Sequence, residues 1–276
     1  MSQITSIEWT DVSWNPVHGC SKVSPGCAHC YAETLSRRYG QTPAPWTPAN
    51  AERNVILKPH KLREPLSWRT PRMVFVNSMS DLFHELVPFD YIDRVFTVMA
   101  EADRHTFQVL TKRPDRMLAY FEHAADYMGL TLADLRPWPN VWLGVSIENR
   151  RFVHRADVLR DTPAAVRFIS AEPLLGPLLN DGGETGLEEF PVYTGWSDGY
   201  EGPDLDLWGI DWLIVGGESG PGHRPLDLEW VRRLRDEADS EGTAFFVKQL
   251  GGARPGTKLE DLPKDLRIRE FPAVRA

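Results

Sequence analysis

Three cysteines have the clearest capacity for chemistry in this sequence. Cys20, Cys27 and Cys30 are its only cysteines among 276 residues, and their spacing is C-x6-C-x2-C. Three thiols cannot all pair into disulfides, and they are one ligand short of a four-cysteine zinc site. Gly19 and the Pro25-Gly26 pair favour a tight loop within the segment 14–33, which we call the cysteine loop.

The cysteine spacing allows three kinds of site. The thiolates could hold three irons of an iron–sulfur cube and leave the fourth iron open to an outside ligand. They could instead bind zinc with His18 or His29 as the fourth ligand, or they could be reactive or incidental thiols without a metal. A helix predicted to follow the cysteines would place its positive dipole end near them, which lowers thiol pKa values and favours metal binding.

Short apolar runs rich in β-branched residues predict the strands that would position this loop. Each run is continuously apolar rather than alternating, which is typical of strands buried on both faces of a parallel sheet. The six clearest runs are 73–78, 106–111, 141–146, 166–171, 212–217 and 244–249. A weaker run, 6–12, precedes the cysteines and predicts a first strand.

Helical patterns fill the intervals between these strands. Predicted helices cover 28–39, 88–102, 114–128 with an extra turn at 131–135, 149–160 and 227–241. In the second, Ile92, Val95, Phe96 and Met99 fall on one face. In the last, Asp227 is a predicted N-cap and Gly242 a predicted C-terminal stop.

Repeated alternation of strand and helix predicts an α/β fold with a parallel sheet, and six or seven such units favour a partial (β/α)6-type barrel over an open sheet. We expect residues 1–250 to form a single barrel-like domain, with 251–276 as a C-terminal tail packed on it. Residues 180–211 are rich in glycine and acid and lack Lys and Arg. They predict an inserted hairpin or flap, either a solvated loop or a lid over the site.

Polar side chains follow all six clear strands, at the edge where parallel α/β folds hold their chemistry. We therefore expect one convergent polar site, with the cysteine loop at the corresponding place after the first strand. Its candidate residues are Asp81, Lys112, Arg113, Glu148, Asn149, Glu172, Glu218, Arg224, Lys248 and Gln249.

Composition and charge limit the expected partners and cellular location of the protein. The net charge of −8 argues against a general nucleic-acid coater, although a local basic cleft is compatible with it. No apolar run reaches the roughly 18–20 residues of a membrane span, and the N-terminus lacks a signal-peptide pattern. The odd cysteine count favours the reducing cytoplasm, so we expect a cytoplasmic protein without a membrane partner.

Six ordered motifs resemble the phage-associated three-cysteine-motif proteins, a family of unassigned function. They are TDVSWNPVHGCSKVSPGCAHCYAE, NSMSDLFHE, LTKRPDR, GVSIEN, SAEPLLGP and DWLIVGGESGPGHRP. Together they cover nearly the whole chain apart from the acidic insert. More distantly, the arrangement resembles the radical S-adenosylmethionine (SAM) superfamily, which carries three cysteines after the first strand of a partial (β/α)6 barrel.

The distant resemblance implies a 4Fe-4S cluster and SAM as cofactors. In that superfamily the open iron chelates SAM, and an electron from a donor cleaves its sulfonium to start radical chemistry. Cys20, Cys27 and Cys30 would then be the cluster ligands. Residues that would lie against SAM are Ser78, Ser80, Asp81, Ser146, Glu148, Asn149, Glu172, Gly216, Gly217 and Glu218. The sequence departs from the superfamily in its first gap, which is six residues where three are usual, and in NSMSD, which replaces a glycine-rich acidic motif.

The basic residues at strand ends suggest an anionic substrate. Lys112, Arg113, Arg224 and Lys248 are the predicted substrate contacts, with a nucleic acid or nucleotide undergoing repair or modification as the candidate. A protein encoded nearby is a further candidate partner. The main alternative is a zinc-stabilised, non-redox binding or adaptor protein of phage or DNA metabolism. A third is a hydrolase that uses Asp81, His84 and Glu85, with the first two on one helical face.

Overall fold

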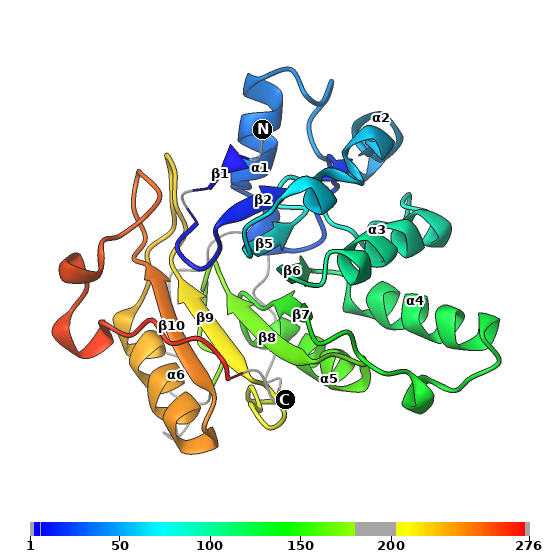
Figure 1. Cartoon of the computed structure of the whole chain (residues 1–276). Helices are drawn as coiled ribbons and strands as arrows, with labels where there is room; N and C mark the ends of the chain where they lie inside the picture. The colour runs from blue at the N-terminus through cyan, green and yellow to red at the C-terminus, as the bar shows by residue number, and fades with distance from the viewer. Residues whose placement is uncertain (1–2, 6, 180–202, 274–276) are drawn as a thin grey trace.

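A curled sheet whose strands follow one another in chain order forms the centre of the molecule (Figure 1). The computed structural model describes residues 3–5, 7–179 and 203–273. Within them the sheet runs β1-β2-β5-β6-β7-β8-β9-β10. The strands are β1 Gln3–Ile4, β2 Val12–Trp14, β5 Met73–Val76, β6 Thr106–Thr111, β7 Val141–Ser146, β8 Val166–Ala171, β9 Trp212–Gly216 and β10 Ala244–Gln249. β1 is antiparallel to β2, and the other seven strands are parallel to their neighbours, as the sequence predicted for the six clear runs.

The strand order contains no reversal, which distinguishes a barrel-type winding from an open doubly wound sheet. The sheet curls into a half-barrel (Figure 1). The α/β class and the partial, parallel barrel expected from the sequence are therefore confirmed at this level.

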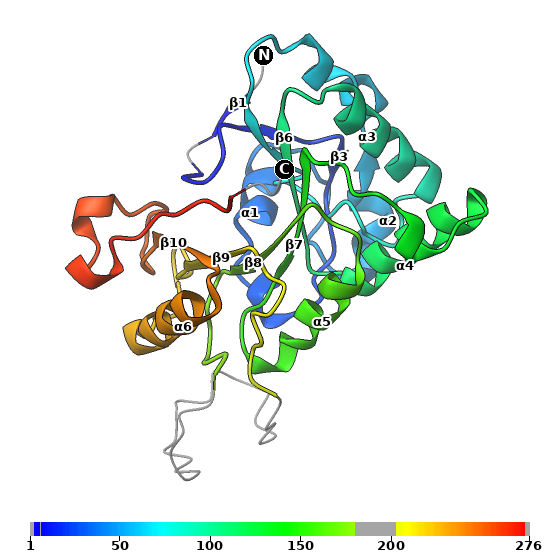
Figure 2. The same cartoon turned by 60° about the horizontal axis from the view of Figure 1, so that its bottom comes forward.

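Helices follow one another around the outside of the curled sheet (Figure 2). They are α1 Tyr31–Arg38, α2 Ala51–Asn54, α3 Phe89–Glu101, α4 Pro114–Tyr127, α5 His154–Asp161 and α6 Leu228–Glu241. Asp227 caps α6 by accepting a hydrogen bond from the backbone N–H of Glu229, and Gly242 ends it at φ 68°. Both predicted signals are confirmed. No helix in the described ranges is long and apolar enough to cross a membrane.

Shorter elements connect these units. β3 Val17–His18 and β4 Ile56–Leu57 pair as a separate antiparallel ladder. The 3-10 helices are η1 Pro25–Cys27, η2 Pro48–Asn50, η3 Pro59–Lys61, η4 Glu64–Ser67, η5 Leu132–Asp134, η6 Arg150–Phe152, η7 Leu259–Asp261 and η8 Lys264–Leu266. η5 confirms the extra turn predicted after α4.

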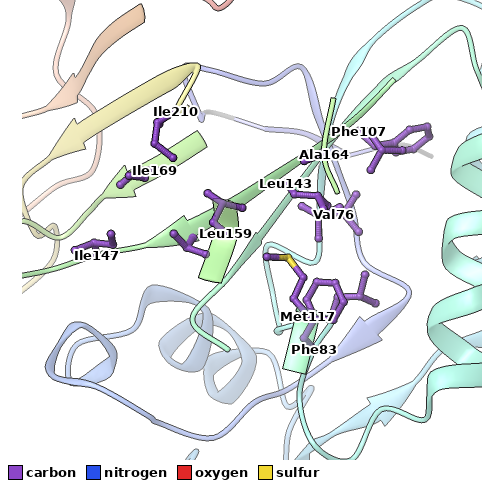
Figure 3. Packing of buried hydrophobic residues seen from close by; sticks show 14 of the residues in the cluster. Val76, Phe83, Phe107, Met117, Leu143, Ile147, Leu159, Ala164, Ile169 and Ile210 are labelled. Carbon is purple, nitrogen blue, oxygen red and sulfur yellow. The ribbon is translucent and has the colours of Figure 1, made fainter. Parts of the chain in front are cut away.

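Alternate residues of each strand face two different cores. The larger core lies between sheet and helices and includes Val76, Phe107, Leu143 and Ile169, together with the face of α3 predicted to be apolar (Figure 3). The smaller core lines the concave side and is largely aromatic. Its buried members are Trp9, Phe75, Trp142, Val166, Phe168, Trp212, Ile214 and Phe246.

Some predicted boundaries were wrong. The first parallel strand is Val12–Trp14 rather than 6–12, because residues 8–9 form a turn. The first helix begins at Tyr31, not at 28, since Pro25–Cys27 is a separate 3-10 turn. Most of the predicted insert, 180–202, lies outside the described residues; in its remainder Leu205, Leu207 and Ile210 are buried in the larger core. In the tail, Leu262 and Leu266 also belong to that core.

Candidate functional site

The concave side changes from aromatic to polar toward the carboxyl ends of the strands. Along β7, Trp142 is followed two residues later by Gly144 and then by Ser146, and β8 continues from Phe168 to Ser170. Gly144 is required here, because a Cβ at this position would lie 2.5 Å from the Phe168 ring. The aromatic side chains thus fill the concave side near the amino ends of the strands, and the polar residues lie at the carboxyl ends.

The three cysteines open into one pocket at this edge. Cys20, Cys27 and Cys30 all line a cavity of about 140 Å³, and none of them forms a disulfide. Cys27 ends η1, and Cys30 is the N-cap residue of α1. The loop that follows the first parallel strand therefore directs three thiols into one space.

Contacts to several strand ends fix the cysteine loop across the mouth of the half-barrel. On the β5 side, the backbone N–H of Gly19 donates to the Met79 carbonyl at 3.0 Å, and the Tyr31 hydroxyl donates to the Ser78 carbonyl at 2.8 Å. On the β7 side, Glu148 accepts from the backbone N–H of Gly26 at 3.3 Å. The loop is therefore held by the same strand ends that carry the predicted site.

A second carboxylate fixes the loop from the β9 side. Glu218 lies 2.9 Å from Nδ1 of His29 and pairs with the guanidinium of Arg224. Arg224 also donates to the Pro25 carbonyl at 3.1 Å. Hydrogen bonds from Arg224 and His29 hold the pKa of Glu218 below its usual value although burial opposes them, so Glu218 binds the loop as a carboxylate.

Arg113 connects the first cysteine to the end of β6. Its guanidinium is 7% exposed and donates to Asp81 at 3.2 Å, to Glu85 at 3.0 Å and to the Cys20 sulfur at 3.4 Å. It also donates to the carbonyl and hydroxyl oxygens of Ser21. Burial alone would lower the pKa of Arg113, but Asp81, Cys20 and Glu85 raise it, so the side chain stays charged.

Burial controls the state of the thiols. It raises the pKa of Cys20 to about 12, against the opposing charge of Arg113. It also raises the pKa of Cys30, although the backbone N–H groups of Glu33 and Ala32 act in the opposite direction. The expected lowering by the helix N-terminus is thus outweighed for Cys30 in the protein without a metal. These thiols are protonated at neutral pH, and a metal that binds them would displace the protons.

The predicted site residues divide into two groups. Nine line the cysteine pocket: Cys20, Cys27, Cys30, Ser78, Ser80, Asp81, Lys112, Arg113 and Ser146. The remaining nine do not: Glu148, Asn149, Glu172, Gly216, Gly217, Glu218, Arg224, Lys248 and Gln249. Of these, Glu148 is fully buried and pairs with Arg155 at 3.0 Å, and Asn149 caps η6. Gly216 lies beside Glu172, and Gly217 packs so closely on Gly251 that a Cβ would be 2.3 Å from its backbone nitrogen.

Each of the four basic residues predicted to bind substrate has a partner within the protein. Lys112 donates to the Ser146 hydroxyl at 2.7 Å, and Lys248 pairs with Glu172 at 2.6 Å. Arg113 and Arg224 have the carboxylate partners described above. Their role in substrate binding stays a prediction, and any anion that binds them would compete with these internal contacts.

The hydrolase alternative lacks the geometry expected for it, and one of the two histidines proposed for zinc has another partner. Residues 81–88 contain turns instead of a helix, so the expectation that Asp81 and His84 share a helical face is wrong. His84 is buried, with Nε2 at 2.9 Å from the Ser21 hydroxyl and Nδ1 accepting from the backbone of Leu86. His29, a proposed zinc ligand, pairs with Glu218. Across the described residues, no group of three or more His, Cys, Asp and Glu side chains is placed to hold one metal ion.

Several residues that line the pocket were not predicted as site residues. Trp46 and Lys22 line the cavity, and the backbone N–H of Lys22 donates to the Trp46 carbonyl at 3.2 Å. Asn77 also lines it with φ 60°. Lys22, Tyr31 and Asn77 fall within the quoted motifs and could have been inferred from them, whereas Trp46 lies outside all six.

Comparison with known proteins identifies the family of this chain. No match was found among curated proteins or among solved structures. Residues 4–268 match the family described as protein of unknown function DUF5131. Because the match spans both the cysteine loop and all seven parallel strands, the chain belongs to the DUF5131 family.

Proposed function

We propose that this protein is an iron–sulfur enzyme of the radical SAM type that acts on a nucleic acid or nucleotide, in repair or modification. One observation carries the proposal: three thiols from the loop after the first parallel strand line a single pocket at the carboxyl edge of a curled parallel sheet. The distant resemblance to the radical SAM superfamily supports the same class of chemistry, and the phage-associated resemblance supports a nucleic acid or nucleotide substrate.

The donor set fits a four-iron cluster. Cys20, Cys27 and Cys30 would hold it, and because each cysteine binds a different iron, the three sulfurs need to share a cavity but not a point. The bound cluster would supply an open iron for SAM and the electron that cleaves it. Arg113 and Lys112 place positive charge beside the thiolates, which offsets part of the cost of burying a metal–thiolate centre.

The remaining pocket residues support a SAM site next to the cysteines. Ser78, Ser80, Asp81 and Ser146, four of the ten residues that the resemblance assigns to SAM, line the same cavity. Glu148, Glu172 and Glu218 act in this proposal by positioning the loop and the basic side chains around it. The electron donor is a separate partner.

Anaerobic reconstitution with iron and sulfide, followed by dithionite and SAM, tests the proposal. We expect a brown protein with about four irons and four sulfides per chain, and formation of 5′-deoxyadenosine and methionine. Cys30→Ser should lose the cluster and the SAM cleavage, whereas Ser240→Ala, on the exposed side of α6, should retain both. The proposal fails if a fully loaded cluster neither binds nor cleaves SAM, and a colourless protein with about one zinc would favour the adaptor alternative.

A further inference from the structure

The segment between α1 and β5 has a charge opposite to that of the rest of the chain. Residues 34–72 contain eight Lys and Arg but only two Glu, a net charge of +6. This leaves 23 Lys and Arg against 37 Asp and Glu elsewhere, a net charge of −14. The overall value of −8 therefore conceals one strongly basic segment on an acidic protein.

Most of the arginines of this segment face solvent. Five of them are exposed: Arg37, Arg38, Arg53, Arg63 and Arg69. None of the five has a carboxylate partner within the described residues, in contrast to the paired arginines Arg155, Arg160, Arg224, Arg232 and Arg235. Lys58 and Lys61 add to the positive field. Burial is the largest cause that lowers the pKa of His18, and with the charges of these two lysines it brings the value to about 4. Lys61 pairs with Glu64 at 3.8 Å, so the uncompensated positive charge of the segment lies mainly on the five exposed arginines.

The basic segment adjoins the cysteine pocket. Figures 1 and 2 show it around the β1–β2 end of the sheet, where it includes most of α1 and the whole of α2. Trp46 lines the pocket from within the segment, and the Asn54 carbonyl packs so closely on Gly19 that a Cβ there would be 1.9 Å away. The segment therefore adjoins the pocket around Trp46 and Asn54, whereas its last residues contact Arg104 and Thr106 at the amino ends of the strands. A long ligand bound along the part near Trp46 and Asn54 would reach the pocket.

The chemistry of the segment favours phosphates as its ligand. Arginine predominates, and its planar guanidinium binds phosphate oxygens in pairs. Tyr39, which follows two of the arginines, is 66% exposed and can stack on a base. The acidic remainder of the molecule would repel a polyanion and so confine its approach to this side.

We propose that residues 34–72 form the docking surface for the phosphate backbone of a single-stranded nucleic acid that presents its base to the cysteine pocket. This inference rests on the proposed function for the identity of the reaction, but the binding itself requires neither SAM nor an electron. It also explains how substrate can bind while Lys112, Arg113, Arg224 and Lys248 keep their internal partners.

The proposed surface can be tested by measuring the affinity of the full-length protein for a labelled oligothymidylate by fluorescence anisotropy. The metal content of each protein sample is determined beforehand. The triple variant Arg38→Gln, Arg53→Gln and Arg63→Gln should weaken binding at least about tenfold at low salt. It should also reduce the slope of the logarithm of the binding constant against the logarithm of the salt concentration by about 2, because three phosphate contacts are lost at roughly 0.7 each. The side chains removed are exposed and lack carboxylate partners in the described structure, and a thermal melt would verify that the fold is intact.

The matched control removes three exposed cations elsewhere: Arg136→Gln, Arg254→Gln and Lys264→Gln. It should bind within about twofold of the wild type. Absence of binding by the intact protein, equal losses in the two triple variants, or tighter binding to phosphatidylserine vesicles than to the oligonucleotide would each overturn the inference. Failure of SAM cleavage with intact oligonucleotide binding would instead count against the proposed function alone.

Discussion

Among single residues, Arg113 has the most consequential set of contacts. Its buried guanidinium neutralises Asp81, donates to the Cys20 sulfur and binds both oxygens of Ser21. Arg113→Met would leave Asp81 buried without its cation, so we expect the free energy of unfolding to fall by about 3–5 kcal/mol. Urea denaturation measures this loss.

Arg116 provides the comparison for that experiment. It lies on the same helix and donates to the backbone carbonyls of His84 and Val87, with no carboxylate partner in the described structure. Arg116→Met should therefore cost only about 1–2 kcal/mol. Equal stability of the two variants would contradict the assignment of Arg113 as the residue that holds the loop.

The sequence predicts residue types at the site better than their roles. Nine of its proposed site residues do line one pocket, because polar residues at the ends of parallel strands converge at one edge. Their partners were beyond prediction: an arginine at a strand end has the same sequence signature whether it contacts a ligand or a carboxylate that the fold brings beside it. Trp46 shows the opposite case, since it reaches the pocket from a proline-rich segment with no periodic pattern.

At the level of elements, β7 depends on a glycine for its place in the half-barrel. The ring of Phe168, on the next strand, occupies the space above Gly144 and is fully buried. Gly144→Ala should reduce stability by about 1–3 kcal/mol, since the added methyl cannot be accommodated without moving the ring. Gly144→Ala should cost less stability when it is made in the Phe168→Leu variant than when it is made in the wild type, because the smaller side chain leaves room for the methyl group. Additive losses in thermal or urea unfolding would argue against this contact as the cause.

Element prediction succeeded where a run was long enough to carry a pattern. The six clear strands are buried on both faces over most of their length and so are largely apolar, whereas β2 has only three residues and follows a turn. The segment from Pro43 to Ser67 escaped prediction for a similar reason. Its 3-10 turns begin at prolines and are too short for helical periodicity, and its place is fixed by distant contacts such as that of Asn54 with Gly19.

At the scale of the whole molecule, the C-terminal tail completes the sheet. The backbone N–H of Val247 on β10 donates to the Ile268 carbonyl at 2.9 Å, and that of Glu270 donates to the Phe245 carbonyl at 3.0 Å. The tail thereby covers the free edge of the last strand, which would otherwise expose unpaired backbone groups. Phe271 also packs against Trp212 and Phe246 of the concave core.

These contacts predict that the tail and the half-barrel unfold together. Leu266 is fully buried in the larger core, so Leu266→Ala should lower the free energy of unfolding by about 2–5 kcal/mol in a single cooperative transition. Leu259→Ala, at a position that is 40% exposed in the same tail, should cost less than about 1 kcal/mol.

Circular dichroism during urea unfolding, combined with limited proteolysis, distinguishes a tail that rests on the domain from a tail that belongs to its core. A tail that merely rests on a domain of residues 1–250 would become sensitive to protease in Leu266→Ala while the rest of the chain kept its unfolding midpoint. A tail that belongs to the core would lower the midpoint of the whole molecule, because the edge of β10 and the apolar surface under Leu266 would be exposed in the same step.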